Sequence, residues 1–306
     1  MRWIIVDNVV GERQKKMTKK PPVNIRRSGM TYTDKVVIVT GGSKGIGEGC
    51  ARVFADAGSK VVICARGTES GNTLAAELSK KGPGSCHFVQ CDVAEVAEVR
   101  EMIDETVRLY GRLDCLINNA GYHPPHKRID DFEVEEFRDL LDMNLVSYWA
   151  ACKHALPHLR ATQGSIINMS SLVGEMGQEG ATTYCATKGA ITAFSKALSI
   201  EEAVNGVRVN TVLPGNIFSD SRVQGLKFTS NPDYINNYYD VNQHCGRSGT
   251  NEEVGQLCLF LASDASSYIS GAAINISFGA ELGYGVKYPT VFLEGHAETE
   301  HNGDED

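Results

Sequence analysis

The sequence lacks several features that would assign it to a specialised class of protein. Its 306 residues contain no CxxC pair, and its nine cysteines, an odd number, stand mostly within apolar runs. Such cysteines behave as small hydrophobic residues, so the sequence predicts no disulfide framework and a reducing compartment, the cytosol. Positive charge is not in excess, since the net charge is −8, and a nucleic-acid role therefore has no electrostatic support. Apolar runs fall short of the ~18 residues that span a membrane, so no membrane segment is expected.

The two ends of the chain differ in charge from the rest. Residues 1–33 include the basic stretch "GERQKKMTKKPPVNIRR", which follows an apolar segment. A signal peptide has the opposite order, so we interpret this segment as a disordered extension, with a transit peptide as the alternative. Residues 288–306 end in "HAETEHNGDED", an acidic tail that we expect to be solvated.

Short runs rich in Val and Ile alternate with helix-length segments between these ends. The expected strands are 35–40, 60–65, 86–93, 113–121, 164–171, 207–215 and 272–279. Continuous apolar runs suit strands covered on both faces, and alternation of strands with helices predicts a parallel, doubly wound sheet. We therefore expect one α/β domain of about seven strands over 34–287, with 216–247, which has no strand signal, as a lid.

A glycine-rich loop follows the first expected strand. In "TGGSKGIG", residues 40–47, Gly41, Gly45 and Gly47 come directly before a helix-length segment. Glycines at this place let the backbone approach a pyrophosphate, which the N-terminus of the helix then stabilises. The loop therefore predicts a dinucleotide cofactor.

The end of the second strand bears on which dinucleotide is bound. An NAD site usually has an acidic residue here for the ribose 2′-hydroxyl, whereas this sequence has Ala65 and Arg66. Arg66, assisted by Lys44, would suit a 2′-phosphate, so the residues favour NADP(H); a merely solvated arginine is the alternative. Asp92 would accept a hydrogen bond from the adenine amino group, or would cap the following helix.

A tyrosine and a lysine stand four residues apart in "TTYCATKGA". Because residues i and i+4 share one face of a helix, Tyr184 and Lys188 are expected to project together. A nearby cation lowers the pKa of a phenol, so Tyr184 would exchange protons with a substrate hydroxyl or carbonyl. An ordinary surface pair is the alternative.

Further polar residues are expected at the same edge of the sheet. Ser171 ends the fifth strand, and Asn118 and Asn119 in "NNAG" end the fourth, where they would bond backbone beside the cofactor. Asn144 lies inside a helical run although asparagine is a poor helix former, so it needs polar partners such as an ordered water beside Lys188.

Together these motifs resemble the short-chain dehydrogenase/reductase family over about 34–285, in the family's order. The resemblance implies a Rossmann-like fold, Tyr184 as the catalytic acid/base, Ser171 holding the substrate, Asn144 holding a proton-relay water and Lys188 binding the nicotinamide ribose. The expected cofactor contacts are Gly41, Lys44, Gly45, Ile46, Gly47, Arg66, Asp92, Val93, Asn119, Tyr184, Lys188, Ile217 and Ser219.

Within the family the chain looks closest to the type 14 group of 17β-hydroxysteroid dehydrogenases, through "NNAGYHPP", "SSLVGEMGQ" and "GAELGYG". That resemblance implies NAD(H), a cytosolic homotetramer and a 17β-hydroxysteroid substrate, with steroid and lipid metabolism as the setting. A sugar dehydrogenase of the fucose type and a reductase of small carbonyl compounds are the alternatives. From another class, a non-catalytic dinucleotide-binding sensor stays open.

Substrate contacts are predicted at His123 and Gln178, besides Ser171 and Tyr184. Aromatic residues of the lid would cover a flat apolar substrate or only pack the lid onto the domain. They are Phe218, Phe228, Tyr234, Tyr238 and Tyr239. His154 and His158 have the spacing of a metal pair, but Pro157 lies between them and no third ligand is near, so we expect surface residues and no metal site.

Overall fold

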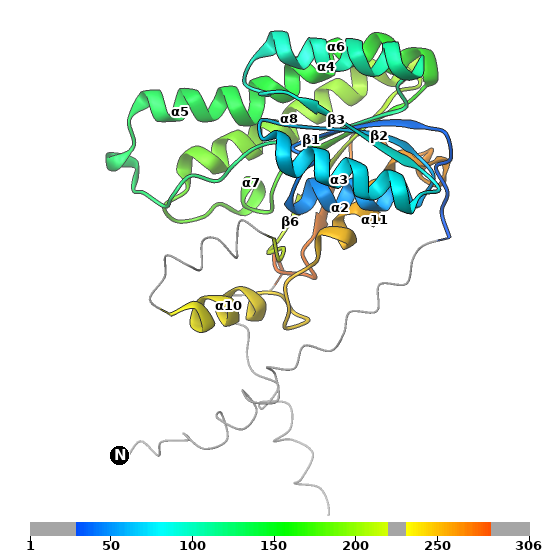
Figure 1. The fold of residues 1–306 in the computed structure, drawn as a ribbon. Helices are drawn as coiled ribbons and strands as arrows, with labels where there is room; N and C mark the ends of the chain where they lie inside the picture. Colours follow the sequence, from blue (N-terminus) through cyan, green and yellow to red (C-terminus); the bar gives the residue numbers. More distant parts are fainter. Residues whose placement is uncertain (1–28, 220–230, 283–306) are drawn as a thin grey trace, which may run out of the picture.

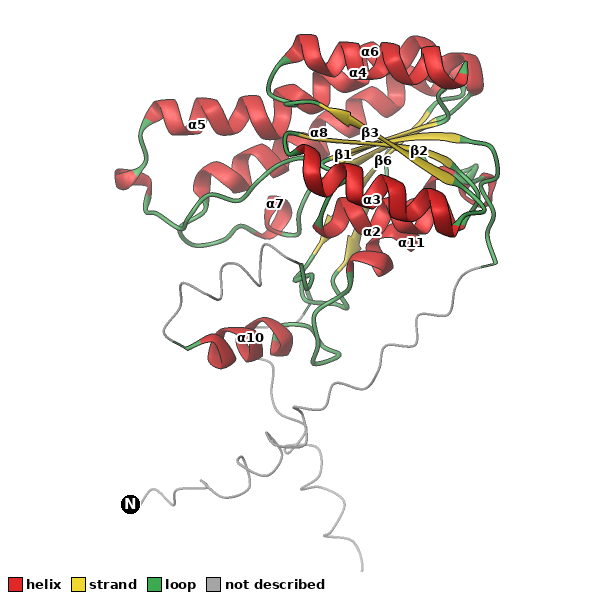
Figure 2. Cartoon of the chain, viewed as in Figure 1, coloured by secondary structure: helices red, strands yellow, loops and turns green. Residues whose placement is uncertain are grey.

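Seven short strands form one parallel sheet, as the sequence predicts. The computed structural model describes residues 29–219 and 231–282, and Figures 1 and 2 show these strands side by side at the centre of the fold. They are β1 (Val36–Thr40), β2 (Lys60–Ala65), β3 (Ser85–Gln90), β4 (Cys115–Asn118), β5 (Ser165–Met169), β6 (Arg208–Pro214) and β7 (Ala273–Ile276). Their order is β3-β2-β1-β4-β5-β6-β7, which confirms the doubly wound, Rossmann-like architecture.

Alternate side chains of each strand enter two separate cores. Val37 and Val39 of β1 belong to one core and Val36 and Ile38 to the other, and all four are buried. This alternation follows from the strand period of two and explains why the sequence shows continuous apolar runs. The first core contains residues of α2, α3 and α11, and the second contains residues of α4, α6 and α8, on the opposite face of the sheet (Figure 1).

The helices have the following bounds: α2 (Gly45–Asp56), α3 (Thr68–Lys81), α4 (Val96–Tyr110), α5 (Val134–Leu141), α6 (Ser147–Thr162), α7 (Val173–Met176), α8 (Thr182–Glu202), α10 (Pro232–Val241) and α11 (Asn251–Ala262). Short 3-10 turns lie at Ile129–Asp131, Ala203–Asn205 and Asp264–Ser266, and a π-helical turn, Asp142–Val146, joins α5 to α6.

The strand order places a crevice at the centre of the sheet. The chain runs outward from β1 through β2 to β3 and then returns to β4 on the other side of β1. The connections after β1 and β4 therefore leave in opposite directions, and ligands of open α/β sheets bind at such a point. The candidate site lies at these carboxyl ends.

The expected lid has a helix of its own. Residues 216–219 and 231–247 are described, and they include α10. Asn216 donates to the Tyr239 carbonyl over 3.2 Å, and Ile217 makes a parallel bridge with Gly249. The lid is therefore tied at its base to the segment before α11.

The predicted extension and tail fall mainly outside the described residues. Residues 1–28 and 283–306 are not described, nor is Phe228 of the lid. Tyr32, which the sequence places in the extension, is instead part of the first core, with its ring edge-on to Phe54 at 5.7 Å. Among the described residues, no helix is both long and apolar enough to cross a membrane.

Candidate active site

The glycine loop after β1 has the shape of a phosphate cradle. Gly41 has a φ of +63°, and a Cβ at Gly47 would lie 2.3 Å from the Gly41 carbonyl oxygen. Helix α2 begins at Gly45, and the side chain of its N-cap, Lys44, makes no capping hydrogen bond. The first amides of α2 are therefore open to an anion, which fits the pyrophosphate of a dinucleotide.

Asn119 holds this loop against the end of β4, as the sequence predicts. Its side-chain amide donates to the carbonyl oxygens of Thr40, at 3.0 Å, and Gly41, at 3.3 Å. The Thr40 hydroxyl accepts hydrogen bonds from the amides of Asn119 and Ala120, at 2.9 and 3.1 Å. The sequence did not single out Thr40, although a threonine that ends a strand just before the loop is a usable signal.

The prediction that Asn118 also bonds backbone beside the cofactor is wrong. Its side-chain amide donates inside the protein to Asn168 Oδ1, at 2.8 Å, and to Cys152 Sγ, at 3.3 Å. Because consecutive side chains of a strand alternate between its faces, Asn118 is directed away from Asn119 and into the layer of α6 and α8.

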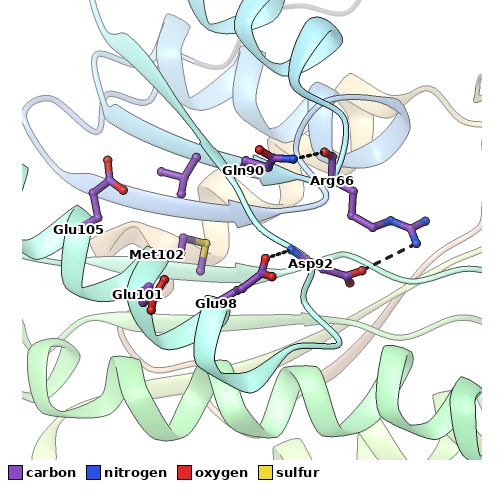
Figure 3. A pocket seen from close by; sticks show the side chains of 8 residues that line it. Arg66, Gln90, Asp92, Glu98, Glu101, Met102 and Glu105 are labelled. Atoms are coloured by element: carbon purple, nitrogen blue, oxygen red, sulfur yellow. Dashed lines mark hydrogen bonds and ion pairs between the residues drawn. The ribbon is translucent and has the colours of Figure 1, made fainter.

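The end of β2 holds Arg66 and Asp92 near each other (Figure 3). The Arg66 side chain is 73% exposed, and its guanidinium lies 3.9 Å from Asp92 Oδ2. Asp92 also accepts a hydrogen bond from the Ala94 amide, so it caps the turn after β3. This is close to the alternative role considered from the sequence, in which Asp92 caps the following helix. Arg66 and Asp92 line a cavity of about 630 Å³ together with Glu98, Glu101 and Glu105, among others. Carboxylates thus border one side of this cavity, where the adenosine of a dinucleotide is expected.

The remaining predicted cofactor contacts lie around the same loop. Ile46 is in the first turn of α2, and Ser219 Cβ lies 3.8 Å from where a Cβ at Gly45 would be. Ile217 lies at the base of the lid, and Val93 is buried directly after Asp92. The chain therefore brings a loop, a strand end and the lid to one side of the crevice.

Helix α8 presents Tyr184 and Lys188 to the same place. The Lys188 ammonium lies 5.6 Å from the centre of the Tyr184 ring, and it donates to the Met169 carbonyl at 2.9 Å. Ser171 follows β5 and lies close enough to the Tyr184 hydroxyl to lower its pKa. The three residues predicted to be catalytic from β5 and α8 are thus together at the edge of the sheet.

Burial dominates the titration of both groups. It lowers the pKa of Lys188 from 10.5 to about 7 and raises the pKa of Tyr184 from 10.0 to about 12. The hydrogen bond with Ser171 opposes the rise for Tyr184, and the nearby Cys185 adds to it. The groups of the chain by themselves therefore do not give the predicted lowering of the tyrosine pKa, because desolvation of the phenolate dominates.

Asn144 lies at the centre of the π-helical turn. It is fully buried, and its side-chain amide donates to the Tyr122 carbonyl at 3.0 Å and to Thr187 Oγ1 at 3.3 Å, while its Oδ1 accepts from the Tyr122 amide. Asn144 therefore joins the segment after β4 to α8, and π turns of this kind are frequent at functional sites. Its Oδ1 and the Lys188 ammonium both lie within 4 Å of the point where Gly121 would carry a Cβ.

His123 and Gln178 meet above Tyr184, as expected for residues at the mouth of a pocket. The His123 ring lies 4.2 Å from the Tyr184 ring and 5.0 Å from the His126 ring. Nε2 of His123 is 3.1 Å from Gln178 Oε1. A polar wall, which we define as His123, His126 and Gln178, therefore borders the tyrosine.

A metal site finds no support in the described part of the chain. No group of three or more His, Cys, Asp or Glu side chains there is arranged to hold an ion. His154 and His158 are half-buried on α6 rather than fully at the surface.

Comparison with known proteins gives a consistent result. Residues 41–281 match the family model described as enoyl-(acyl carrier protein) reductase. The chain is 44% identical over 259 residues to an L-fucose dehydrogenase of Bos taurus, a match that covers 85% of this chain and 94% of that protein.

Two solved structures share its fold. The Cj0485 dehydrogenase superposes with a TM-score of 0.79 at 26% identity, over 84% of this chain and 98% of that one. An aldohexose dehydrogenase of Thermoplasma acidophilum gives a TM-score of 0.75 at 28% identity, over the same shares of the two chains.

Proposed function

Because the chain belongs to the short-chain dehydrogenase/reductase family, we propose that it oxidises a hydroxyl group of a sugar similar to L-fucose with NAD(P). The observation that carries this proposal is the polar wall against Tyr184, beside which Ser171 also lies. A named relative acts on L-fucose, and a structural neighbour acts on an aldohexose.

The residues have complementary roles in this proposal. The Ser171 and Tyr184 hydroxyls hold the reacting oxygen of the substrate, and Tyr184 takes the proton of the hydroxyl as the carbonyl forms. A nicotinamide cofactor held here would supply the acceptor for the hydride that leaves the carbon bearing this hydroxyl. Lys188 binds the nicotinamide ribose and supplies positive charge, and Asn144 keeps the loop after β4 in place. The glycine loop orients the cofactor through its pyrophosphate.

The polar wall favours a sugar over a steroid in this proposal. His123 and Gln178 offer hydrogen-bond donors and acceptors at the place where the substrate would extend from Tyr184. The hydroxyls of a sugar ring can hydrogen-bond with His123 and Gln178, which otherwise bond each other, whereas the apolar body of a steroid offers them no hydrogen bond. The steroid interpretation from the sequence is supported by exposed aromatic residues of the lid, such as Phe218 and Tyr238, so it stands second.

The purified full chain, supplied with either cofactor, tests the substrate class directly. We expect reduction of the nicotinamide with L-fucose and related aldoses at a kcat/KM at least about tenfold above that for 17β-estradiol. Gln178→Leu is expected to raise the KM for the sugar about tenfold, because a hydrogen bond to the substrate is lost. His87→Leu, which changes a histidine of β3 paired with Glu105, serves as the control. Faster oxidation of estradiol than of every aldose would reverse the order of the two candidates.

We further propose that NADP(H) is the preferred cofactor, with NAD(H) as the alternative from the family resemblance. Ala65 stands where an acidic residue is expected, and Arg66 follows it. Ser43, Gly67 and Thr68 line a second cavity, of about 670 Å³, together with Arg52 and three glutamates, among others. Gly67 is the N-cap of α3 and has no side chain there, so the first amides of this helix add to the attraction for a 2′-phosphate.

Arg66→Ala is expected to raise the KM for NADP about thirtyfold while changing the KM for NAD less than about threefold, because only NADP carries the phosphate. Steady-state kinetics with both cofactors measure this. Arg100→Ala, at a similarly exposed arginine of α4, is the matched control. Equal changes for NAD and NADP would show that Arg66 does not read the phosphate.

Other expectations from the resemblance stay predictions. They are the homotetramer, the cytosolic location and the bounds of the domain and its terminal extensions. A sensor that binds the cofactor without turnover is the alternative from another class, and it predicts cofactor binding with no oxidation of any alcohol in the same panel.

A further inference from the structure

A second tyrosine, which the sequence motifs do not include, lies against Lys188. Tyr148 belongs to α6, is 1% exposed, and is among the largest fully buried side chains. The Lys188 ammonium is 5.5 Å from the centre of the Tyr148 ring and 5.6 Å from the centre of the Tyr184 ring. The lysine therefore contacts the aromatic rings of two tyrosines.

The hydroxyl of Tyr148 acts on the same backbone atom as the lysine. It donates to the Met169 carbonyl at 3.3 Å, and the Lys188 ammonium donates to that oxygen at 2.9 Å. Burial raises the pKa of Tyr148 well above its usual value, so the hydroxyl stays a neutral donor over the working range of pH. Tyr148 thus holds in place the Met169 carbonyl, which accepts from the ammonium, and its own ring is a neighbour of the ammonium.

No carboxylate forms an ion pair with Lys188 in the described part of the chain. The titratable side chains shown against Lys188 are Tyr148 from α6 and Tyr184 from α8; next to these tyrosines are Cys152, Cys185 and His123. A buried ammonium without a counter-ion needs other stabilisation to stay charged, and aromatic ring faces supply it electrostatically.

We propose that Tyr148 is a positioning residue that keeps Lys188 charged and directed at the catalytic site through the face of its ring, while its hydroxyl holds the Met169 carbonyl that accepts from the lysine. This proposal depends on the proposed function only for the experiment that measures turnover. It goes beyond the motif residues because Tyr148 acts through Lys188 and Met169 and is hydrogen-bonded to neither the substrate-holding hydroxyls nor the glycine loop. Burial lowers the pKa of Lys188 to about 7, so a small stabilisation of the cation decides its charge near neutral pH.

Three variants of the full chain test the proposal. Tyr148→Phe keeps the ring and loses only the hydroxyl, whereas Tyr148→Met fills similar space without a ring face. The matched control is Phe54→Met, which makes the same kind of change at a fully buried aromatic residue of the opposite core.

The expected result is a change in the pH dependence of alcohol oxidation. At low pH, where Lys188 is charged in every variant, Tyr148→Met should match the wild type. As the pH rises, Lys188 of this variant loses its proton earlier, so its kcat should level off about tenfold lower. Tyr148→Phe should stay within about threefold of the wild type across the range. A purely structural role would lower the Tyr148→Met rate by one factor at every pH.

Direct titration separates this proposal from the proposed function. With isotope-labelled lysine side chains, the signal of Lys188 is identified by its loss in Lys188→Arg and followed by NMR as the pH is raised. The proposal predicts that Lys188 titrates at lower pH in Tyr148→Met than in the wild type, Tyr148→Phe and Phe54→Met. The same titration in all four proteins would overturn it, whether or not any alcohol is oxidised. Failure of the proposed function alone would leave the titration difference in place and remove only the turnover.

Discussion

Replacing Tyr184 with phenylalanine is expected to lower sugar oxidation by about a thousandfold and to change the affinity for the cofactor less than about threefold. The substitution removes only the hydroxyl that is proposed to exchange the proton and that lies near Ser171. The ring keeps its contacts with His123, at 4.2 Å, and with the Lys188 ammonium, at 5.6 Å. The site should therefore keep its shape and lose its acid/base group.

Steady-state turnover measures the expected loss of oxidation, and binding of the reduced cofactor measures its expected affinity. Tyr268→Phe, at a fully exposed tyrosine, is the control and should retain full activity. More than a tenth of the wild-type rate in Tyr184→Phe would mean that another group moves the proton. Because burial keeps the pKa of Tyr184 near 12, the phenol is protonated at neutral pH, so oxidation should accelerate as the pH rises until Lys188 loses its proton near pH 7, and then level off.

Lys188→Met is expected to abolish turnover and yet to stabilise the fold by about 3 kcal/mol at neutral pH. The ammonium is buried and its pKa falls from 10.5 to about 7 on folding, so the unfolded chain binds the proton more tightly. Methionine removes this cost. It also removes a hydrogen bond to the Met169 carbonyl, which still accepts from Tyr148, and that loss offsets part of the gain.

The sign of the pH dependence is fixed by the same shift. Below about pH 7 the lysine is charged in both states and its full cost is present, and the cost shrinks as the pH rises toward 10.5, above which both states are neutral. The advantage of Lys188→Met should therefore be greatest at acidic pH and disappear near pH 10.5. Denaturant unfolding at several pH values measures it, with Lys196→Met on the exposed side of α8 as the control. A Lys188→Met protein less stable than the wild type at about pH 6 would show that the ammonium is paired or solvated.

The fold could be predicted because its strands are buried on both faces. The run "VVIVT" of β1 is apolar almost throughout since its alternate residues serve two cores, and the same holds for β2 and β5. Strand ends follow less directly from the sequence. The run predicted at 113–121 contains only Cys115–Asn118 as strand, because the residues from Asn119 onward turn toward the glycine loop.

The candidate site could be predicted where local spacing decides it. Tyr184 and Lys188 share a face of α8 because of the helical period, and Asn119 reaches the glycine loop. The direction of Asn118 and the balance of burial at Tyr184 depend on the layers packed around them, which no local pattern records. Tyr148 was missed for the same reason, since its contact with Lys188 joins two helices that are distant in sequence.

The most direct test of the dehydrogenase is to follow the hydrogen itself. The full chain is incubated with oxidised cofactor and L-fucose deuterated at its ring carbons, and the reduced nicotinamide is examined by mass spectrometry. We expect one deuterium in each molecule of reduced cofactor with the wild type and none with Tyr184→Phe. Bound cofactor that never gains deuterium from this sugar or from any other aldose would contradict the assignment.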